Sequence, residues 1–149
     1  MNNLYEKISD FIDSQKENIV SDLATFVDLE GHFNEKDSVL KSQKWFREQL
    51  EAEGFECSYH DVAEDKAGIV VGILGKDRPG KPVIFSGHCD TVHYTGTFDR
   101  KFFVEDGKAF GPGVLDMKGG LIIALYAVKA LNAVGYEDRP IKMIIVGEE

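Results

Sequence analysis

The stretch that decides the fold is Val83-Ile84-Phe85-Ser86-Gly87-His88-Cys89-Asp90-Thr91. Its first three residues form a continuous apolar run, which predicts a strand buried on both faces of a sheet. Polar residues follow at once, and in an open α/β sheet ligands collect at the carboxyl ends of the strands. Because successive side chains of a strand alternate, His88 and Asp90 should point the same way and Cys89 away from them. The segment predicts a candidate metal site at a strand end, with a histidine satisfied in an ordinary turn as the alternative.

Three other segments have the three- and four-residue apolar spacing of helices. They cover residues 3–29, 38–52 and 119–134. Ser14 and Glu17 have the spacing of a capping box, so a second helix can begin within the first segment. Gly54 and Gly135 are the expected ends of the other two. The third segment is apolar nearly all round, which is typical of a buried helix.

Short β-rich segments alternate with these helices. They cover residues 55–60, 68–74, 81–86 and 141–146, the last with an apolar run suited to a central strand. Asp106-Gly107 predicts a hairpin between residues 102–105 and 108–110. Helices that alternate with buried strands predict an α/β fold, with three layers (α/β/α) around a largely parallel sheet.

Length and composition limit the class of protein. The 149 residues suffice for one domain with its own core, and a net charge of −9 argues against a nucleic-acid binder. The longest hydrophobic run, residues 121–128, is far shorter than the roughly 20 residues of a membrane span. The N-terminus resembles no signal peptide, and Cys57 and Cys89 are interpreted as small buried hydrophobes rather than a disulfide framework. We expect a soluble, cytoplasmic protein with no membrane partner.

Residues 75–81 spell the G-x-x-x-x-G-K opening of a phosphate-binding loop, which raises the alternative of a nucleotide-binding domain. Pro82 stands where that loop needs Ser or Thr, and a strand follows where the mechanism needs a helix N-terminus. The segment is better interpreted as a turn between two strands.

A second candidate, Asp116, lies in the glycine-rich segment 111–120 directly before the buried helix. Four glycines and a proline in these ten residues indicate a backbone on an uncommon path, and Gly119 and Gly120 allow close packing beneath a site. Asp116 is either the N-cap of the helix or a site residue, and the segment alone favours neither.

The third candidate is the pair Glu148-Glu149, which follows the apolar run 141–146. Adjacent acids at a strand end point in different directions, so one can bind a metal while the other faces water; solvated surface charge is the alternative. With His88 and Asp116 they are expected at one sheet edge, where imidazole and carboxylates suit zinc, or else cobalt or manganese. Two ions about 3.5–4 Å apart would need a bridging carboxylate.

Taken in order, these motifs resemble the co-catalytic zinc peptidases, a family that includes glutamate carboxypeptidase, aminoacylase, acetylornithine deacetylase and succinyl-diaminopimelate desuccinylase. The resemblance rests on Phe85 to Gly120 and on Gly147 to Glu149. The spelling of Gly87 to Val92 and of Ala109 to Gly113 is nearest to the glutamate carboxypeptidase branch. It implies a hydrolase with a zinc-exopeptidase-like catalytic domain. Such an enzyme cleaves an amide or peptide bond next to a free carboxylate, in a small peptide or an N-acyl amino acid.

Carried over to this sequence, the resemblance gives roles to five residues. His88 and Glu149 would each bind one of two zinc ions, and Asp116 would bridge both ions ahead of a cis peptide bond. Asp90 would orient His88. Glu148 would be the general base that takes a proton from the metal-bridging water, whose pKa near 7 permits this at neutral pH.

The family also has two further metal ligands downstream and a lid and dimerisation domain. Residues 1–149 are therefore expected to be the N-terminal portion of the catalytic domain of a homodimeric parent enzyme, inactive when isolated. The alternative is a non-catalytic metal-binding fragment. His32 and His60 are predicted to lie at the surface, and His93 is a candidate for the wall of the substrate cleft.

Overall fold

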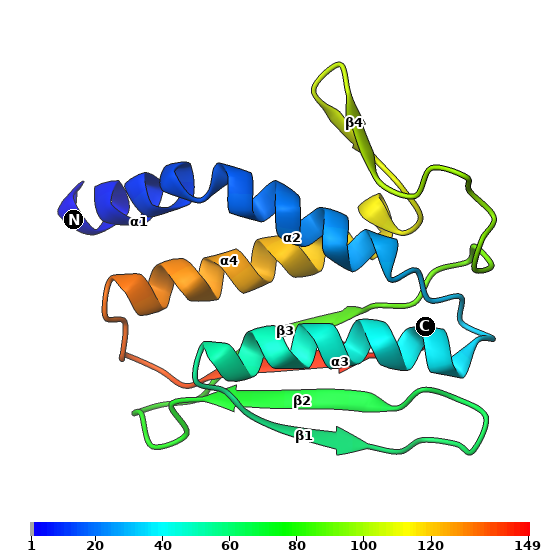
Figure 1. The fold of residues 1–149 in the computed structure, drawn as a ribbon. Helices are drawn as coiled ribbons and strands as arrows, with labels where there is room; N and C mark the ends of the chain where they lie inside the picture. Colours follow the sequence, from blue (N-terminus) through cyan, green and yellow to red (C-terminus); the bar gives the residue numbers. More distant parts are fainter. Residues whose placement is uncertain (1) are drawn as a thin grey trace.

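The structure is a computed structural model that describes residues 2–149 as a mixed α/β fold with helices above a curved sheet (Figure 1). The elements in chain order are α1 (Asn2–Ser14), α2 (Lys16–Asp28), α3 (Lys36–Ala52), β1 (Glu56–His60), β2 (Ile69–Leu74), β3 (Val83–His88), β4 (Phe103–Glu105), β5 (Lys108–Phe110), the π-helical turn η1 (Val114–Lys118), α4 (Gly119–Ala133) and β6 (Ile141–Val146). These elements confirm the predicted helices and strands. Among the described residues, none of the helices is both long and apolar enough to cross a membrane.

The main sheet has the strand order β1-β2-β6-β3, so β6 is a central strand as predicted. Only β3 and β6 are parallel, whereas β1 pairs with β2 and β2 with β6 in antiparallel fashion. The prediction of a largely parallel sheet is therefore wrong. The reason is the short connections at 61–68 and 75–82, since a parallel pair needs a long crossover and a short loop reverses the chain.

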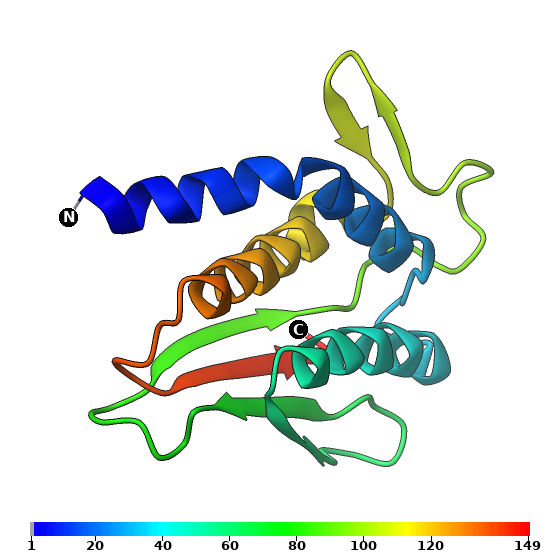
Figure 2. The ribbon, with the colours of Figure 1, turned by 60° about the vertical axis from the view of Figure 1, so that its left-hand side comes forward.

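The helices lie on one face of the sheet in the part of the chain that the structure describes (Figure 2). A Cβ atom added at Gly72 of β2 would meet Leu50 of α3, and one added at Gly87 of β3 would meet Leu121 of α4. Pairing across β6 places these two glycines on the same face of the sheet. The α/β class is confirmed, but residues 2–149 form two layers where three were expected.

Strand β3 lies at an edge of the sheet, so the prediction that it is buried on both faces is wrong. Val83 is 39% exposed and Ile84 is 55% exposed. The central strand β6 has the buried positions instead, with Ile141, Met143 and Ile145 almost completely covered. Both β3 and β6 contain an apolar run, so the run alone does not predict burial. Their different burial follows from their place in the sheet, at its edge or at its centre.

One hydrophobic core joins the helices to the sheet, and burial of this apolar surface drives the fold. Phe46 of α3 and Leu125 of α4 are fully buried in it. Ile123 is 72% exposed, so α4 is covered on fewer sides than its sequence suggests.

The predicted boundary between α1 and α2 is confirmed, but its chemistry differs from the expected capping box. Gln15 is the N-cap of α2 and makes no side-chain capping hydrogen bond. The Ser14 hydroxyl instead donates to the carbonyl of Phe11, at 2.6 Å, in the preceding helix.

Candidate metal centre

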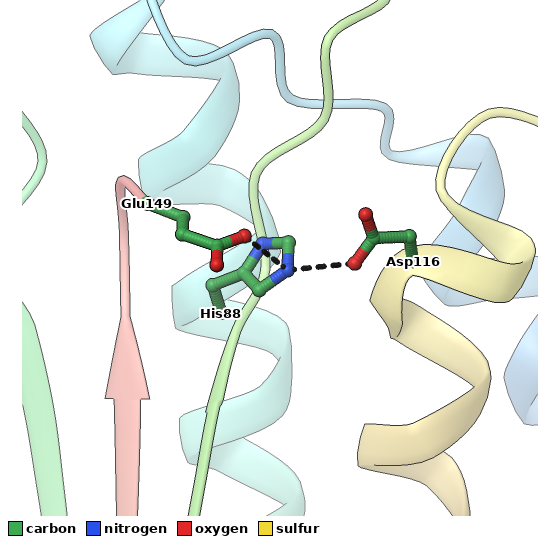
Figure 3. A group of neighbouring side chains, drawn as sticks. All are labelled: His88, Asp116 and Glu149. Carbon is green, nitrogen blue, oxygen red and sulfur yellow. Dashed lines mark hydrogen bonds and ion pairs between the residues drawn. The ribbon is translucent and has the colours of Figure 1, made fainter.

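Three predicted ligands, His88, Asp116 and Glu149, come together at the carboxyl ends of strands β3 and β6 (Figure 3). His88 is the last residue of β3, and its register partner in the parallel strand β6 is Val146, three positions before Glu149. Asp116 comes from η1, which leads into α4 over the same end of β3. The parallel β3–β6 pair therefore brings residues 88 and 149 side by side, and η1 supplies the third candidate ligand.

One imidazole nitrogen faces both carboxylates. His88 Nε2 lies 3.0 Å from Asp116 Oδ1 and 3.1 Å from Glu149 Oε2. One ligand atom of each residue lies within 4.8 Å of the others. The two carboxylates are open to solvent, with side chains 81% and 73% exposed, whereas the imidazole is 12% exposed. A cation can therefore reach the cluster without displacing protein.

Asp90 contacts two of the candidate ligands, His88 and Glu149. Its side chain is 6% exposed, and its Oδ1 lies 3.0 Å from Nδ1 of His88. Its other oxygen, Oδ2, accepts a hydrogen bond from the backbone N–H of Glu149 at 3.3 Å. Cys89, between them in sequence, has no exposed surface and lies in the core, so the predicted alternation is confirmed.

The electrostatics of His88 favour a positive charge at this point. Burial opposes the charged imidazolium, but hydrogen bonds with Asp116 and Asp90 and the charge of Glu149 outweigh burial and raise the pKa of His88. When Nδ1 donates its proton to Asp90, a neutral ring presents a lone pair at Nε2. Two carboxylate oxygens then face that lone pair, an arrangement that a proton or a metal ion stabilises.

Asp116 lies where the backbone leaves helical geometry. Its φ and ψ are −125° and 96°, and its peptide bond to Met117 is cis. The turn starts at Gly113, whose φ of 73° is left-handed and whose position leaves no room for a Cβ atom, since Thr91 Cγ2 would lie 2.5 Å away. Helix α4 has Lys118 as its N-cap without a side-chain capping bond, so the N-cap interpretation of Asp116 is wrong.

Glu148 lines the same cavity and forms an ion pair that the sequence did not indicate. Lys66 Nζ donates to Glu148 Oε1 at 2.6 Å, and this hydrogen bond raises the pKa of Lys66. Lys66 lies in the loop before β2, 82 residues away in sequence, so no spacing could have revealed the pair. The adjacent Gly147 packs closely on that loop, where an added Cβ would lie 2.7 Å from Cβ of Ala67.

The cluster opens into a cavity of about 360 Å³. Its lining combines the site residues with apolar groups, among them Phe33, Val92 and Leu115. His93, the candidate for the wall of a substrate cleft, also lines this cavity. A cavity with a few convergent polar groups and an apolar wall can hold a small organic molecule beside the ligands.

The other residues and the loop singled out in the sequence lie outside the candidate metal centre. His60 is exposed, as predicted, but His32 is buried, with its ring stacked on Tyr94 at a centroid distance of 3.7 Å, so its predicted surface position is wrong. Cys57 is half-buried. Residues 75–82 form the turn between β2 and β3 with no helix after it, which excludes the phosphate-binding loop there.

Residues 84–149 match Peptidase family M20/M25/M40, which confirms the family resemblance. Carboxypeptidase G2 from Pseudomonas sp. (strain RS-16) is 31% identical over 125 residues, which cover 80% of this chain and 29% of that protein. A succinyl-diaminopimelate desuccinylase from Rickettsia typhi is 31% identical over 94 residues, which cover 56% of this chain and 23% of that protein. The chain thus spans less than a third of the length of either relative.

Solved structures show the same fold. Human carnosine dipeptidase 1 aligns with a TM-score of 0.84 and 23% identity, covering 95% of this chain and 34% of that chain. The dipeptidase Dug1p from Saccharomyces cerevisiae aligns with a TM-score of 0.80 and 21% identity, again over 95% of this chain and 34% of that chain. At these identities the likeness concerns the fold alone.

Proposed function

We propose, from the match of residues 84–149 to Peptidase family M20/M25/M40, that the chain is the metal-binding part of an amide or peptide hydrolase. The observation that carries the proposal is the convergence of His88, Asp116 and Glu149 on one point of a cavity wall. The curated relatives support it through their names, which denote carboxypeptidase, dipeptidase and desuccinylase activities.

The donor set fits a divalent cation. One imidazole nitrogen and two carboxylates suit zinc best, with cobalt and manganese as substitutes. Asp116 is the proposed shared ligand of two ions, because a carboxylate has two oxygens and this one is largely exposed. When bound, the metal polarises the scissile carbonyl and makes water a stronger acid.

The other site residues act on protons and on orientation. Asp90 holds the proton on Nδ1 of His88, which leaves Nε2 free as a ligand. Glu148 is the proposed general base: its carboxylate lines the cavity and can take a proton there and return it to the leaving amine. Lys66 holds that carboxylate at the rim of the cavity through their ion pair.

The substrate that we propose is a small peptide or an N-acyl amino acid, cleaved next to a free carboxylate. Residues 1–149 form the N-terminal portion of the catalytic domain in this proposal. Further sequence would supply the remaining ligands and a dimerisation domain, which the coverage of less than a third of each relative supports. A cytoplasmic homodimer is part of the same proposal.

The isolated chain is then expected to bind zinc weakly and to hydrolyse nothing measurable. Isothermal titration with zinc tests the site directly: the wild-type chain should bind, and His88→Ala should not. As a matched control, His60→Ala removes an exposed imidazole and should bind like the wild type. Absence of zinc, cobalt and manganese binding to the wild-type chain would refute the metal centre.

The base is tested in the longer protein with Glu148→Gln. Loss of a general base lowers kcat by about 10²–10⁴-fold, while zinc content should stay unchanged because Glu148 is not a proposed ligand. Full activity of this variant would overturn the assignment of Glu148. Measurable hydrolysis by the purified, zinc-loaded 149-residue chain would show that no further ligand is needed.

A further inference from the structure

Lys118 is a lysine without any exposed surface, two positions after the proposed ligand Asp116. Its ammonium group donates to the carbonyls of Phe26 and Glu30, each at 2.6 Å, and to Ser42 Oγ at 3.1 Å. An ammonium has three donors, and three acceptors satisfy them here. Two of these acceptors are main-chain carbonyls and the third is a hydroxyl. The ammonium group of Lys118 therefore binds mainly the backbone of other parts of the chain.

The two carbonyls, of Phe26 and Glu30, lie where helix α2 ends, and Ser42 lies in α3. The last carbonyls of a helix have no partner within the helix and carry the negative end of its dipole. Helix α2 has no basic residue in its own last turn, and Lys118 supplies the cation from another element. Its Nζ also lies 4.6 Å from the centroid of the Phe26 ring, and Ser42 of α3 donates to the same Glu30 carbonyl at 2.9 Å. Lys118 therefore ties η1 to both α2 and α3.

The link between Lys118 and helices α2 and α3 bears on the metal site because His88 Nε2, at 3.0 Å, is the contact described for the Asp116 side chain. Its side chain is 81% exposed, so its position follows from the backbone of η1. That backbone is fixed at its start by Gly113, which packs on Thr91, and the N–H of Lys118 closes the turn on the Gly113 carbonyl at 2.8 Å. The buried ammonium fixes the other end of the turn.

We propose that Lys118 is a positioning residue for Asp116: it anchors η1 to α2 and α3 and thereby sets the affinity and geometry of the metal site without touching it. The proposal rests on the proposed function for its metal readout. The anchoring itself is a property of the metal-free chain and is measured separately.

The test compares Lys118→Met, which keeps the length of the side chain and removes the ammonium, with Lys118→Gln, which keeps a shorter donor. Zinc titration should show an affinity lowered about 10-fold or more in Lys118→Met, the lower end of the usual effect of groups that support ligands. The visible spectrum of bound cobalt should change as well, and Lys118→Gln should be intermediate in both measurements. The control is Val128→Ala, a fully buried position farther along α4, which loses stability but should keep zinc affinity and the cobalt spectrum.

Amide hydrogen exchange of the metal-free chain gives the second readout. Residues 114–118 should exchange at least 10-fold faster in the lysine variants, while β6 keeps its wild-type rates. Wild-type exchange in η1, or wild-type zinc affinity with an unchanged cobalt spectrum, would overturn the positioning role. If Lys118→Met does not fold, Lys118→Gln decides by the same criteria. Failure of the wild-type chain to bind metal would refute the proposed function, and exchange in η1 would still decide the anchoring.

Discussion

Replacement of Asp90 by Asn changes a single oxygen to a nitrogen beneath the proposed metal centre. Asp90 is 4% exposed and uses one oxygen for Nδ1 of His88 and the other for the N–H of Glu149. Both of these groups donate when His88 binds metal through Nε2. Asparagine has one acceptor oxygen, and its amide nitrogen would face a donor, so one of the two contacts must be lost.

We therefore expect Asp90→Asn to weaken zinc binding by about 10–100-fold, which corresponds to about 1.4–2.8 kcal/mol. Titration calorimetry with zinc measures the affinity, and urea unfolding followed by Trp45 fluorescence measures stability without metal. Asp10→Asn, an exposed position on α1, is the matched control and should leave both values unchanged. A zinc affinity of Asp90→Asn within twofold of the wild type would refute the role of Asp90 as a support for both ligands.

Four further outcomes follow from burial and charge. Phe46→Ala should lower the free energy of unfolding by about 3–5 kcal/mol, because the ring has no exposed surface; a loss below 1 kcal/mol in urea unfolding would contradict the described core. The pKa of His88 is raised above its ordinary value of 6.5, so the metal-free chain should gain stability below pH 6.5 and lose it as the pH rises through the folded pKa. Zinc affinity should rise over the same range, by up to about tenfold per pH unit for one released proton, and a flat profile in titrations from pH 5.5 to 8 would contradict this. Iodoacetamide at pH 8 should modify Cys57 before Cys89, since burial raises the pKa of the Cys89 thiol to about 12; equal rates by peptide mass spectrometry would contradict its burial.

The sequence predicted the helices and strands and the cluster of three candidate ligands, because both depend on local features of the sequence. Apolar periodicity depends on neighbours within a few residues, and His88, Asp116 and Glu149 each follow or precede an apolar run. The direction of the strands was missed because it depends on the connections between them. Ile84 resembles a buried residue in sequence, yet it lies in an edge strand, and periodicity is the same in both cases.

The contacts of Lys66 and Lys118 could not be predicted from the sequence, because they join residues that are far apart along the chain. Lys66 reaches Glu148 across 82 positions, and Lys118 reaches the carbonyl of Phe26 across 92. Lysine is also a residue that usually stays in solvent, so its pattern gives no hint of complete burial. The burial of His32 was missed because its ring stacks on Tyr94, which is distant in sequence, in addition to contacting the neighbouring Phe33.

The parallel pairing of β3 with β6 has a consequence for the order of events in folding. Residues 88 and 149 become neighbours only after these strands dock, and the register joins Val83 to Ile141 across 58 positions. Contacts between such distant segments form late, because loop closure must precede them. A zinc ion bound at the proposed site would then stabilise the folded chain but would not nucleate folding. Stopped-flow fluorescence of Trp45 should accordingly show slower unfolding with zinc and an unchanged folding rate, and faster folding with zinc would contradict this order.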